Sequence, residues 1–161
     1  MVLLRGLRGQ SAMEFLMTYG WAILIMVVVV GVLFYVGVFN PGTAAPSACT
    51  LGAGFSCYSY IVYPGNGTLT LELGQATGNA VTITGVACDA RTTAGNWTSM
   101  SHTVQTGKHY VIGGIPCYKS TGIRPGAGEF YSGTIFLNYT DTETQITHTI
   151  KGDLSYKLGN A

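Results

Sequence analysis

The chain has 161 residues and a formal net charge of +1, and only 9% of its residues are charged. Because no excess of basic residues is available to neutralise phosphates, we expect no nucleic-acid partner. The low charge, together with many Gly, Thr, Ser and Tyr residues, is typical of a β-rich surface domain and argues against an intracellular helical enzyme.

An uncharged apolar segment runs from Phe15 to Phe39. As a helix it would be about 37 Å long, and a bilayer core is about 30 Å thick. Arg5 and Arg8 precede the segment and no basic residue follows before Arg91, so the positive-inside rule predicts a cytoplasmic amino terminus and an external remainder. The segment is longer than the core of a secretory signal and has no small-residue cleavage site at its end. It therefore predicts a helix that stays in the membrane.

The stretch RGQSAMEFLMTYGWAIL resembles the processing site of archaeal type IV pilin-like proteins with class III signal peptides. In that family a prepilin peptidase removes a short basic leader that ends in Gly, and the mature chain begins with Gln. The resemblance implies a leader over residues 1–9 and cleavage between Gly9 and Gln10. It also implies that the mature helix, residues 10–39, first spans the membrane and then joins the core of a filament.

Glu14 becomes the fifth residue of the mature chain, the place where the family carries Glu. The family often has Ser third, whereas Ser11 is second here and Ala12 is third. No basic side chain lies on the helix beyond Gln10, so the new α-amine of Gln10 is the local cation for Glu14. The resemblance implies that Glu14 meets this amine on a neighbouring subunit and sets the register. Two alternatives stay open: Glu14 pairs with its own amine, or it only favours the helix start, with Ser11 completing a capping box.

Residues 40–48 contain Asn40-Pro41-Gly42 and predict a helix stop and a linker. Residues 49–161 show frequent period-two alternation and glycine-rich turns, which predict an all-β, sandwich-like globular domain of six to eight strands outside the cell. The chain as a whole is therefore expected to be α+β. Candidate strands lie at 58–63, 69–73, 81–84, 110–112, 135–139, 146–150 and 154–158, with a bulge or turn at Lys151-Gly152.

Four cysteines follow the apolar segment, and none has the C-x-x-C spacing of a metal or redox site. Of the three pairings that four cysteines allow, we favour Cys49 with Cys57 and Cys88 with Cys117. The first pair would close a short loop, and the second would close the loop that carries Asn96. Free, buried cysteines are the alternative.

Three sequons, at Asn66, Asn96 and Asn138, also follow the apolar segment. Together with an even cysteine count they indicate an extracellular domain and N-glycosylation. Asn66 lies in a predicted turn and is the best-placed acceptor, whereas Asn138 lies inside a predicted strand and is the poorest. Unmodified surface turns are the alternative.

Catalytic patterns are weak, and we expect neither an enzyme nor a bound cofactor or metal. His102 and His109 are predicted to be solvated, and His148 is predicted at the edge of the core. None of the three has the spacing of a metal ligand, and no nucleophile-elbow or zinc-protease motif occurs. Asp141 and Glu143 in a Thr-rich turn are a weak candidate for holding a cation.

The function predicted from the sequence and the resemblance is a structural subunit of an archaeal type IV adhesion pilus. Its partners would be identical or related pilin subunits, the prepilin peptidase and the pilus assembly machinery. The precursor would lie in the membrane and the mature chain in a cell-surface filament, with its β domain exposed for surface attachment. The alternative is a membrane-anchored extracellular binding protein that is processed by the same peptidase without polymerising.

Overall fold

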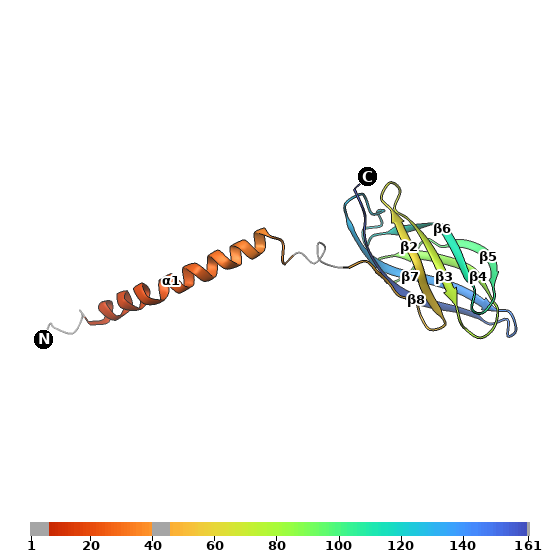
Figure 1. Cartoon of the computed structure of the whole chain (residues 1–161), viewed down its shortest axis with the longest axis horizontal. Helices are drawn as coiled ribbons and strands as arrows, with labels where there is room; N and C mark the ends of the chain where they lie inside the picture. Colours follow the sequence, from red (N-terminus) through yellow and green to blue (C-terminus); the bar gives the residue numbers. More distant parts are fainter. Residues whose placement is uncertain (1–6, 40–45, 161) are drawn as a thin grey trace. The chain divides into compact units, whose positions relative to one another are not determined.

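The computed structural model describes residues 7–39 and 46–160, and it divides the chain into two compact units at residues 44 and 45. The first unit contains one helix, α1 (Leu7–Tyr35), and the second contains eight strands (Figure 1). The predicted α+β class, a long hydrophobic helix followed by an all-β domain, is thereby confirmed. The predicted linker residues 40–45 lie outside the described residues.

The helical part of the apolar segment ends at Tyr35, four residues before the predicted limit at Phe39. Gly37 adopts a positive φ of 73°. Its N–H donates to the carbonyl of Phe34 at 3.1 Å, and the N–H of Val38 donates to the carbonyl of Leu33 at 3.2 Å. These two bonds form a Schellman motif, in which a glycine satisfies the last carbonyls of a helix.

In the uncut chain Ser11 lies inside α1, whose described part starts at Leu7. The capping-box alternative for Ser11 and Glu14 concerns the mature chain that begins at Gln10, and it stays a prediction.

The β domain begins with a very short strand and continues with seven longer ones. The strands are β1 (Ala48–Cys49), β2 (Phe55–Tyr63), β3 (Thr68–Gln75), β4 (Val81–Asp89), β5 (Thr98–Val104), β6 (His109–Tyr118), β7 (Phe130–Asp141) and β8 (Thr147–Lys157). Five predicted strand regions fall inside β2, β3, β4, β6 and β7. The predicted strands at 146–150 and 154–158 are parts of the single strand β8, and each reaches one residue beyond an end of it. β1 and β5 were not predicted.

The strands form one mixed sheet in the order β1-β8-β7-β4-β6-β3-β2, and β5 pairs with the first part of β4. The sheet is nearly closed and barrel-like, and it consists of two antiparallel halves (Figure 1). One half contains β1, β8, β7, β4 and β5, and the other contains β2, β3 and β6. A two-residue parallel pairing of β4 with β6 joins the halves.

β8 is one continuous strand, and this corrects the predicted bulge or turn at Lys151-Gly152. Its pairing with β7 runs without a register shift, and Gly152 stands opposite Ile135. A Cβ atom on Gly152 would lie 2.8 Å from the Cα of Leu51 and would collide with the carbonyl oxygen of Thr50. The glycine is therefore required by a close approach of backbone from another part of the chain.

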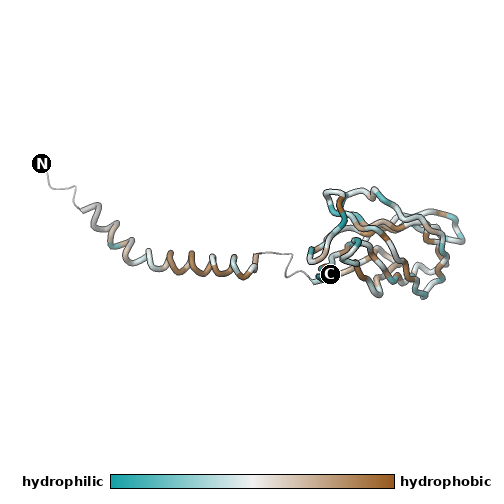
Figure 2. The backbone as a smooth tube through the Cα atoms, turned by 90° about the horizontal axis from the view of Figure 1, so that it is seen from above, coloured by the Kyte–Doolittle hydropathy of each residue, from teal (hydrophilic) through white to brown (hydrophobic). Residues whose placement is uncertain are grey.

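The core lies between the inward faces of the two halves. On β3, Leu69, Leu71 and Leu73 are fully buried, and the alternate positions Thr68 and Thr70 are only half-buried. Because strand side chains point to opposite faces in turn, this alternation puts one face of β3 in the core. Figure 2 shows apolar residues alternating with polar ones around the domain, whereas the carboxyl-terminal half of α1 is continuously apolar.

Both disulfide bonds lie where the two halves of the sheet meet. Cys88 on β4 is bonded to Cys117 on β6, at the parallel junction. Cys49 on β1 is bonded to Cys57 on β2, and β1 and β2 are the two ends of the strand order. This is the pairing favoured from the sequence, and it ties the halves together covalently on both sides.

Candidate functional site

The helix α1 contains a stretch, Met17–Tyr35, that is long and apolar enough to cross a membrane. Its 19 residues rise about 28 Å, close to the thickness of a bilayer core. None of the stretch is buried within the structure, and apolar side chains are exposed on all sides of the helix, from Met17 through Trp21 to Tyr35. A helix of this kind is typical of membrane spans and of signal sequences.

Glu14 lies exposed on α1, one turn after Gln10 and one turn before Thr18. The Thr18 hydroxyl donates a hydrogen bond to the main-chain carbonyl of Glu14 at 2.9 Å, so this bond does not involve the Glu14 carboxylate. Because Cα–Cβ bonds in a helix tilt toward its amino end, the Glu14 side chain has the turn that contains Gln10 within reach. Gly9 and Gln10 belong to the helical backbone, and the side chain of Gln10 lies outside the described residues.

The three sequon asparagines have different surroundings. Asn66 is exposed in the turn between β2 and β3, and its side-chain oxygen accepts hydrogen bonds from the hydroxyl of Thr68 at 2.7 Å and from the N–H of Thr68 at 3.2 Å. Asn96 is exposed in the loop between β4 and β5. Asn138 is half-buried in β7, and its side-chain oxygen accepts a hydrogen bond from Thr149 at 2.6 Å.

Asp89 at the end of β4 holds the loop that carries Asn96. Its buried carboxylate accepts bonds from the N–H of Arg91 at 2.9 Å, from Nε of Arg91 at 2.8 Å and from the N–H of Gly95 at 3.3 Å. The hydrogen bond from the Arg91 guanidinium lowers the pKa of Asp89, because it favours the charged form. The sequence analysis missed Asp89; its one local signal is the Asp-x-Arg spacing.

Each of the three histidine rings lies against a tyrosine ring, and the three histidines do not come together. The ring centroids are 3.6 Å apart for His102 with Tyr110, 3.6 Å for His109 with Tyr58 and 5.2 Å for His148 with Tyr139. His148 is exposed instead of lying at the edge of the core. Among the described residues, no group of three or more His, Cys, Asp or Glu side chains is placed to hold a metal ion.

The Asp141 carboxylate serves the turn between β7 and β8. It accepts hydrogen bonds from the N–H groups of Glu143 at 2.8 Å and Thr144 at 3.0 Å, and from the side chain of Asn79 at 3.2 Å. The Thr144 and Glu143 N–H groups lower the pKa of Asp141. The structure therefore gives this carboxylate a role in the turn, and Glu143 contributes its backbone.

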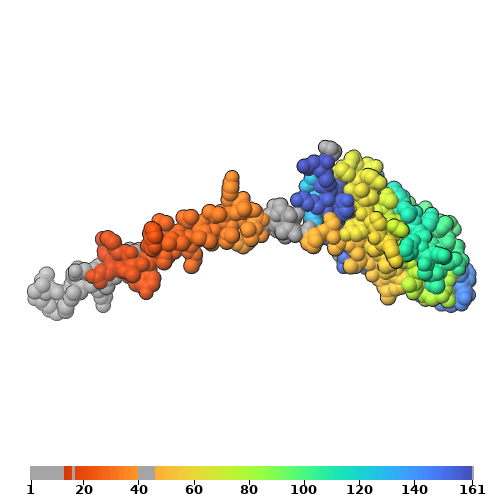
Figure 3. Space-filling view, in the orientation of Figure 1, coloured from red at the N-terminus to blue at the C-terminus, as the bar shows by residue number. Residues whose placement is uncertain are grey.

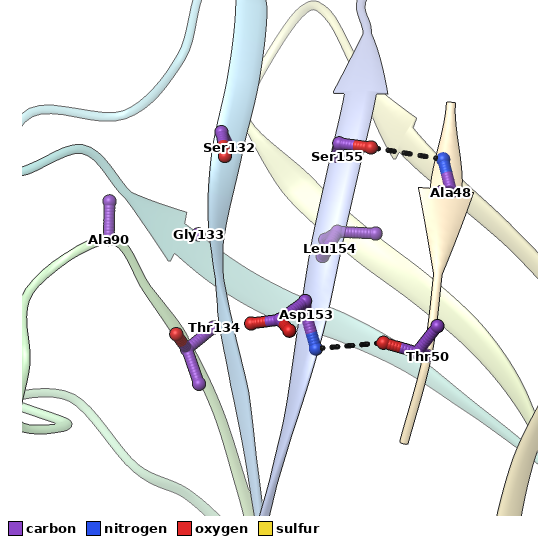
Figure 4. Close-up of a pocket in the computed structure, with 9 residues that line it drawn as sticks. All are labelled: Ala48, Thr50, Ala90, Ser132, Gly133, Thr134, Asp153, Leu154 and Ser155. Carbon is purple, nitrogen blue, oxygen red and sulfur yellow. Dashed lines mark hydrogen bonds between the residues drawn. The ribbon is translucent and has the colours of Figure 1, made fainter. Parts of the chain in front are cut away.

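A polar groove lies on the outer face of the sheet where β1, β8 and β7 run side by side (Figure 4). Thr134 and Asp153 are cross-strand partners in it, and so are Ser132 and Ser155. The hydroxyl of Ser155 is already used, because it accepts from the N–H of Ala48 and donates to the carbonyl of Pro46, each at 3.1 Å. The lining residues are Ala48, Thr50, Ala90, Ser132, Gly133, Thr134, Asp153, Leu154 and Ser155.

Comparison with known proteins gives no family for this chain. No protein-family model matches it, and no curated protein matches it.

Proposed function

We propose that the mature chain is a structural, non-catalytic subunit of an archaeal type IV pilin-like filament. The observation that supports this function best is the combination of two units in one chain. One is a helix of membrane-spanning length with apolar side chains exposed on every side, and the other is a β domain with two disulfide bonds. A helix of that kind can be surrounded first by lipid and then by sister helices without any change of sequence.

Cleavage between Gly9 and Gln10 would convert a membrane anchor into a subunit that can be extracted. It removes both basic residues before the apolar segment, Arg5 and Arg8, and creates an α-amine at Gln10. In a helix bundle from which water is excluded, the Glu14 carboxylate then needs a cation. An amine from a neighbouring subunit supplies it and sets the axial register between the two chains.

The two disulfide bonds fit a location outside the cell, because such bonds form and persist in oxidising compartments. The precursor is therefore proposed to lie across the membrane with its amino terminus in the cytoplasm, and the mature chain to lie in a surface filament. Its partners are identical or related subunits, the prepilin peptidase and the assembly machinery.

The amino-terminal peptide of protein sheared from the surface of cells tests this proposal. We expect mass spectrometry of the sheared fraction to identify a mature chain that begins at Gln10. A Gly9→Val chain serves as the matched control, and it should keep its nine-residue leader and stay in the membrane fraction. A sheared filament fraction without this chain, or a mature mass that Gly9→Val leaves unchanged, would contradict the proposal.

The polar groove favours a second candidate, a membrane-anchored surface protein that binds a ligand without polymerising. Asp153 and Thr134 project into this groove from neighbouring strands (Figure 4). The same shearing experiment separates the candidates, because a chain that does not polymerise is cleaved at Gly9 but stays with the membrane.

A further inference from the structure

The chain enters the β domain through a segment that is weakly held. We call residues 46–54 the entry segment. Because β1 runs antiparallel to β8, Pro46 lies beside Ser155, and Ser47 accepts a hydrogen bond from the N–H of Lys157 at 3.3 Å. Only two residues of the entry segment, Ala48 and Cys49, pair as a strand.

A pull that draws Pro46 away from Ser155 loads the hydrogen bonds of the entry segment one after another. Beyond β1, the next bonds are from the N–H of Thr50 to the carbonyl of Asp153 at 2.9 Å and from the N–H of Ala76 to the carbonyl of Gly54 at 2.8 Å. Each such bond contributes little net free energy, because a hydrogen bond to water replaces it when it breaks. Hydrogen bonds alone would therefore let the whole entry segment peel from β8 under a small force.

The Cys49–Cys57 disulfide interrupts this peeling after three residues. It connects β1 directly to β2 and bypasses residues 50–56. β2 pairs with β3 from Phe55 to Tyr63, and its side chains Phe55 and Val62 are buried in the core. Across the boundary between the halves, Tyr60 of β2 meets Tyr156 of β8 edge-on, with ring centroids 5.9 Å apart.

We propose that the Cys49–Cys57 disulfide is a mechanical stop, which passes tension from the amino-terminal helix into β2 and the core before the entry segment can peel beyond Cys49. The Cys88–Cys117 disulfide completes the device on the opposite side, because it prevents the two halves of the sheet from separating there. Only the purpose of the stop rests on the proposed function, because a filament subunit transmits tension. The mechanical response belongs to the chain itself.

Single-molecule stretching of the full chain in detergent, held by tags at its two ends, tests the stop. The unmodified, oxidised chain should release at most the three residues before Cys49, about 10 Å of contour length, before the main unfolding event. In the Cys49→Ala/Cys57→Ala chain, an additional release should precede it at lower force. That release should free the nine residues of the entry segment, about 30 Å of contour length. The helix contributes equally to both traces.

Two further chains serve as controls. The Cys88→Ala/Cys117→Ala chain should unfold without the early release, and its final contour should grow by about 100 Å, because 29 positions separate these two cysteines. The Ser155→Ala chain keeps both disulfides and loses the hydroxyl that holds Pro46 and Ala48. Its main unfolding force should equal that of the unmodified chain, and this result does not depend on the folding of a variant that lacks a disulfide.

Three results would overturn the stop: an early release of more than about 10 Å in the oxidised, unmodified chain, the absence of the release of about 30 Å in Cys49→Ala/Cys57→Ala, or a lower main unfolding force in Ser155→Ala. None of these depends on whether the chain forms filaments, which the shearing experiment reports separately.

Discussion

Cys88 and Cys117 stand directly opposite each other in the parallel pairing of β4 with β6, with their Cα atoms 4.5 Å apart. This pairing is only two residues long, yet it joins the two halves of the sheet. The disulfide therefore reinforces a junction that has few backbone hydrogen bonds of its own. Cys49 and Cys57 reinforce the opposite boundary.

The two disulfides should differ in their contribution to stability. On the chain-entropy account, Cys88–Cys117, with a separation of 29, contributes about 3.5 kcal/mol, and Cys49–Cys57, with a separation of 8, contributes about 2.5 kcal/mol. Urea unfolding of the two double-alanine chains should therefore show the larger loss for Cys88→Ala/Cys117→Ala. The reverse order would mean that native contacts, and not the length of the closed loop, set the contributions.

Replacing Asp89 with Asn should lower the free energy of unfolding by about 2 kcal/mol at pH 7, because the charged partner of Arg91 and of two N–H groups is lost. The pKa of Asp89 is lowered in the folded state, so its stabilisation is complete above the unfolded pKa of about 4 and is lost as the pH falls through the folded pKa. Urea unfolding from pH 7 to pH 2 should show a constant difference between the two chains above about pH 5 that shrinks below about pH 4. A difference independent of pH would contradict this account.

Replacing Gly152 with Ala should destabilise the domain by roughly 1–3 kcal/mol, because the backbone of Thr50 and Leu51 must move to admit a methyl group. Gly159→Ala is the matched control, since a Cβ atom there meets nothing within 4 Å. Thermal unfolding of the two chains measures the difference. Equal unfolding midpoints for Gly152→Ala and Gly159→Ala would show that residues 50–51 move aside without loss of stability.

Replacing Glu14 with Ala or Gln should leave cleavage and membrane insertion intact and remove the chain from sheared filaments. The physical reason is that both variants lose the charge that pairs with an α-amine inside a water-free bundle. Met13→Ala, a change of an exposed neighbour on the same turn, should assemble normally. Immunoblots of sheared and membrane fractions measure the distribution, and a normal filament yield from the Gln variant would exclude a role for the charge in the register.

Glycan occupancy should be higher at Asn66 and Asn96 than at Asn138. The first two side chains are exposed in a turn and a loop, whereas Asn138 is half-buried in β7 and its oxygen is held by Thr149. Glycopeptide mass spectrometry of protein from its native surface measures the occupancy at each site. Modification at Asn138 with an unmodified Asn66 would contradict the ranking.

The features predicted correctly from the sequence are those with a strong local period. The alternation of Leu69, Leu71 and Leu73 with polar residues placed β3, and the uninterrupted apolar run placed α1. β5 was missed because Val104 is its one buried side chain, so that no apolar alternation marks it. Strands whose residues mostly face solvent leave no such pattern.

Two errors have a tertiary or conformational cause. Gly152 was interpreted as a turn because a glycine inside a strand pattern usually marks irregular backbone. The structure instead requires glycine there because the backbone of a segment about a hundred positions earlier in the chain lies against it. The helix end was placed too late because the apolar run continues past it. The stop is a single glycine, Gly37, whose positive φ no hydrophobic pattern reveals. The candidate site at Gly9, Gln10 and Glu14 comes from a motif alone, and it stays a prediction.

The absence of a polar stripe on Met17–Tyr35 has a consequence for any ordered assembly. A helix that is equally apolar on every side can rotate about its own axis without changing the free energy of its contact with apolar surroundings. Hydrophobicity therefore does not fix the rotation of the helix about its axis. The orientation of one helix against the next must then depend on side-chain size at individual positions, such as the gaps at Gly20 and Gly31, or on the charge of Glu14.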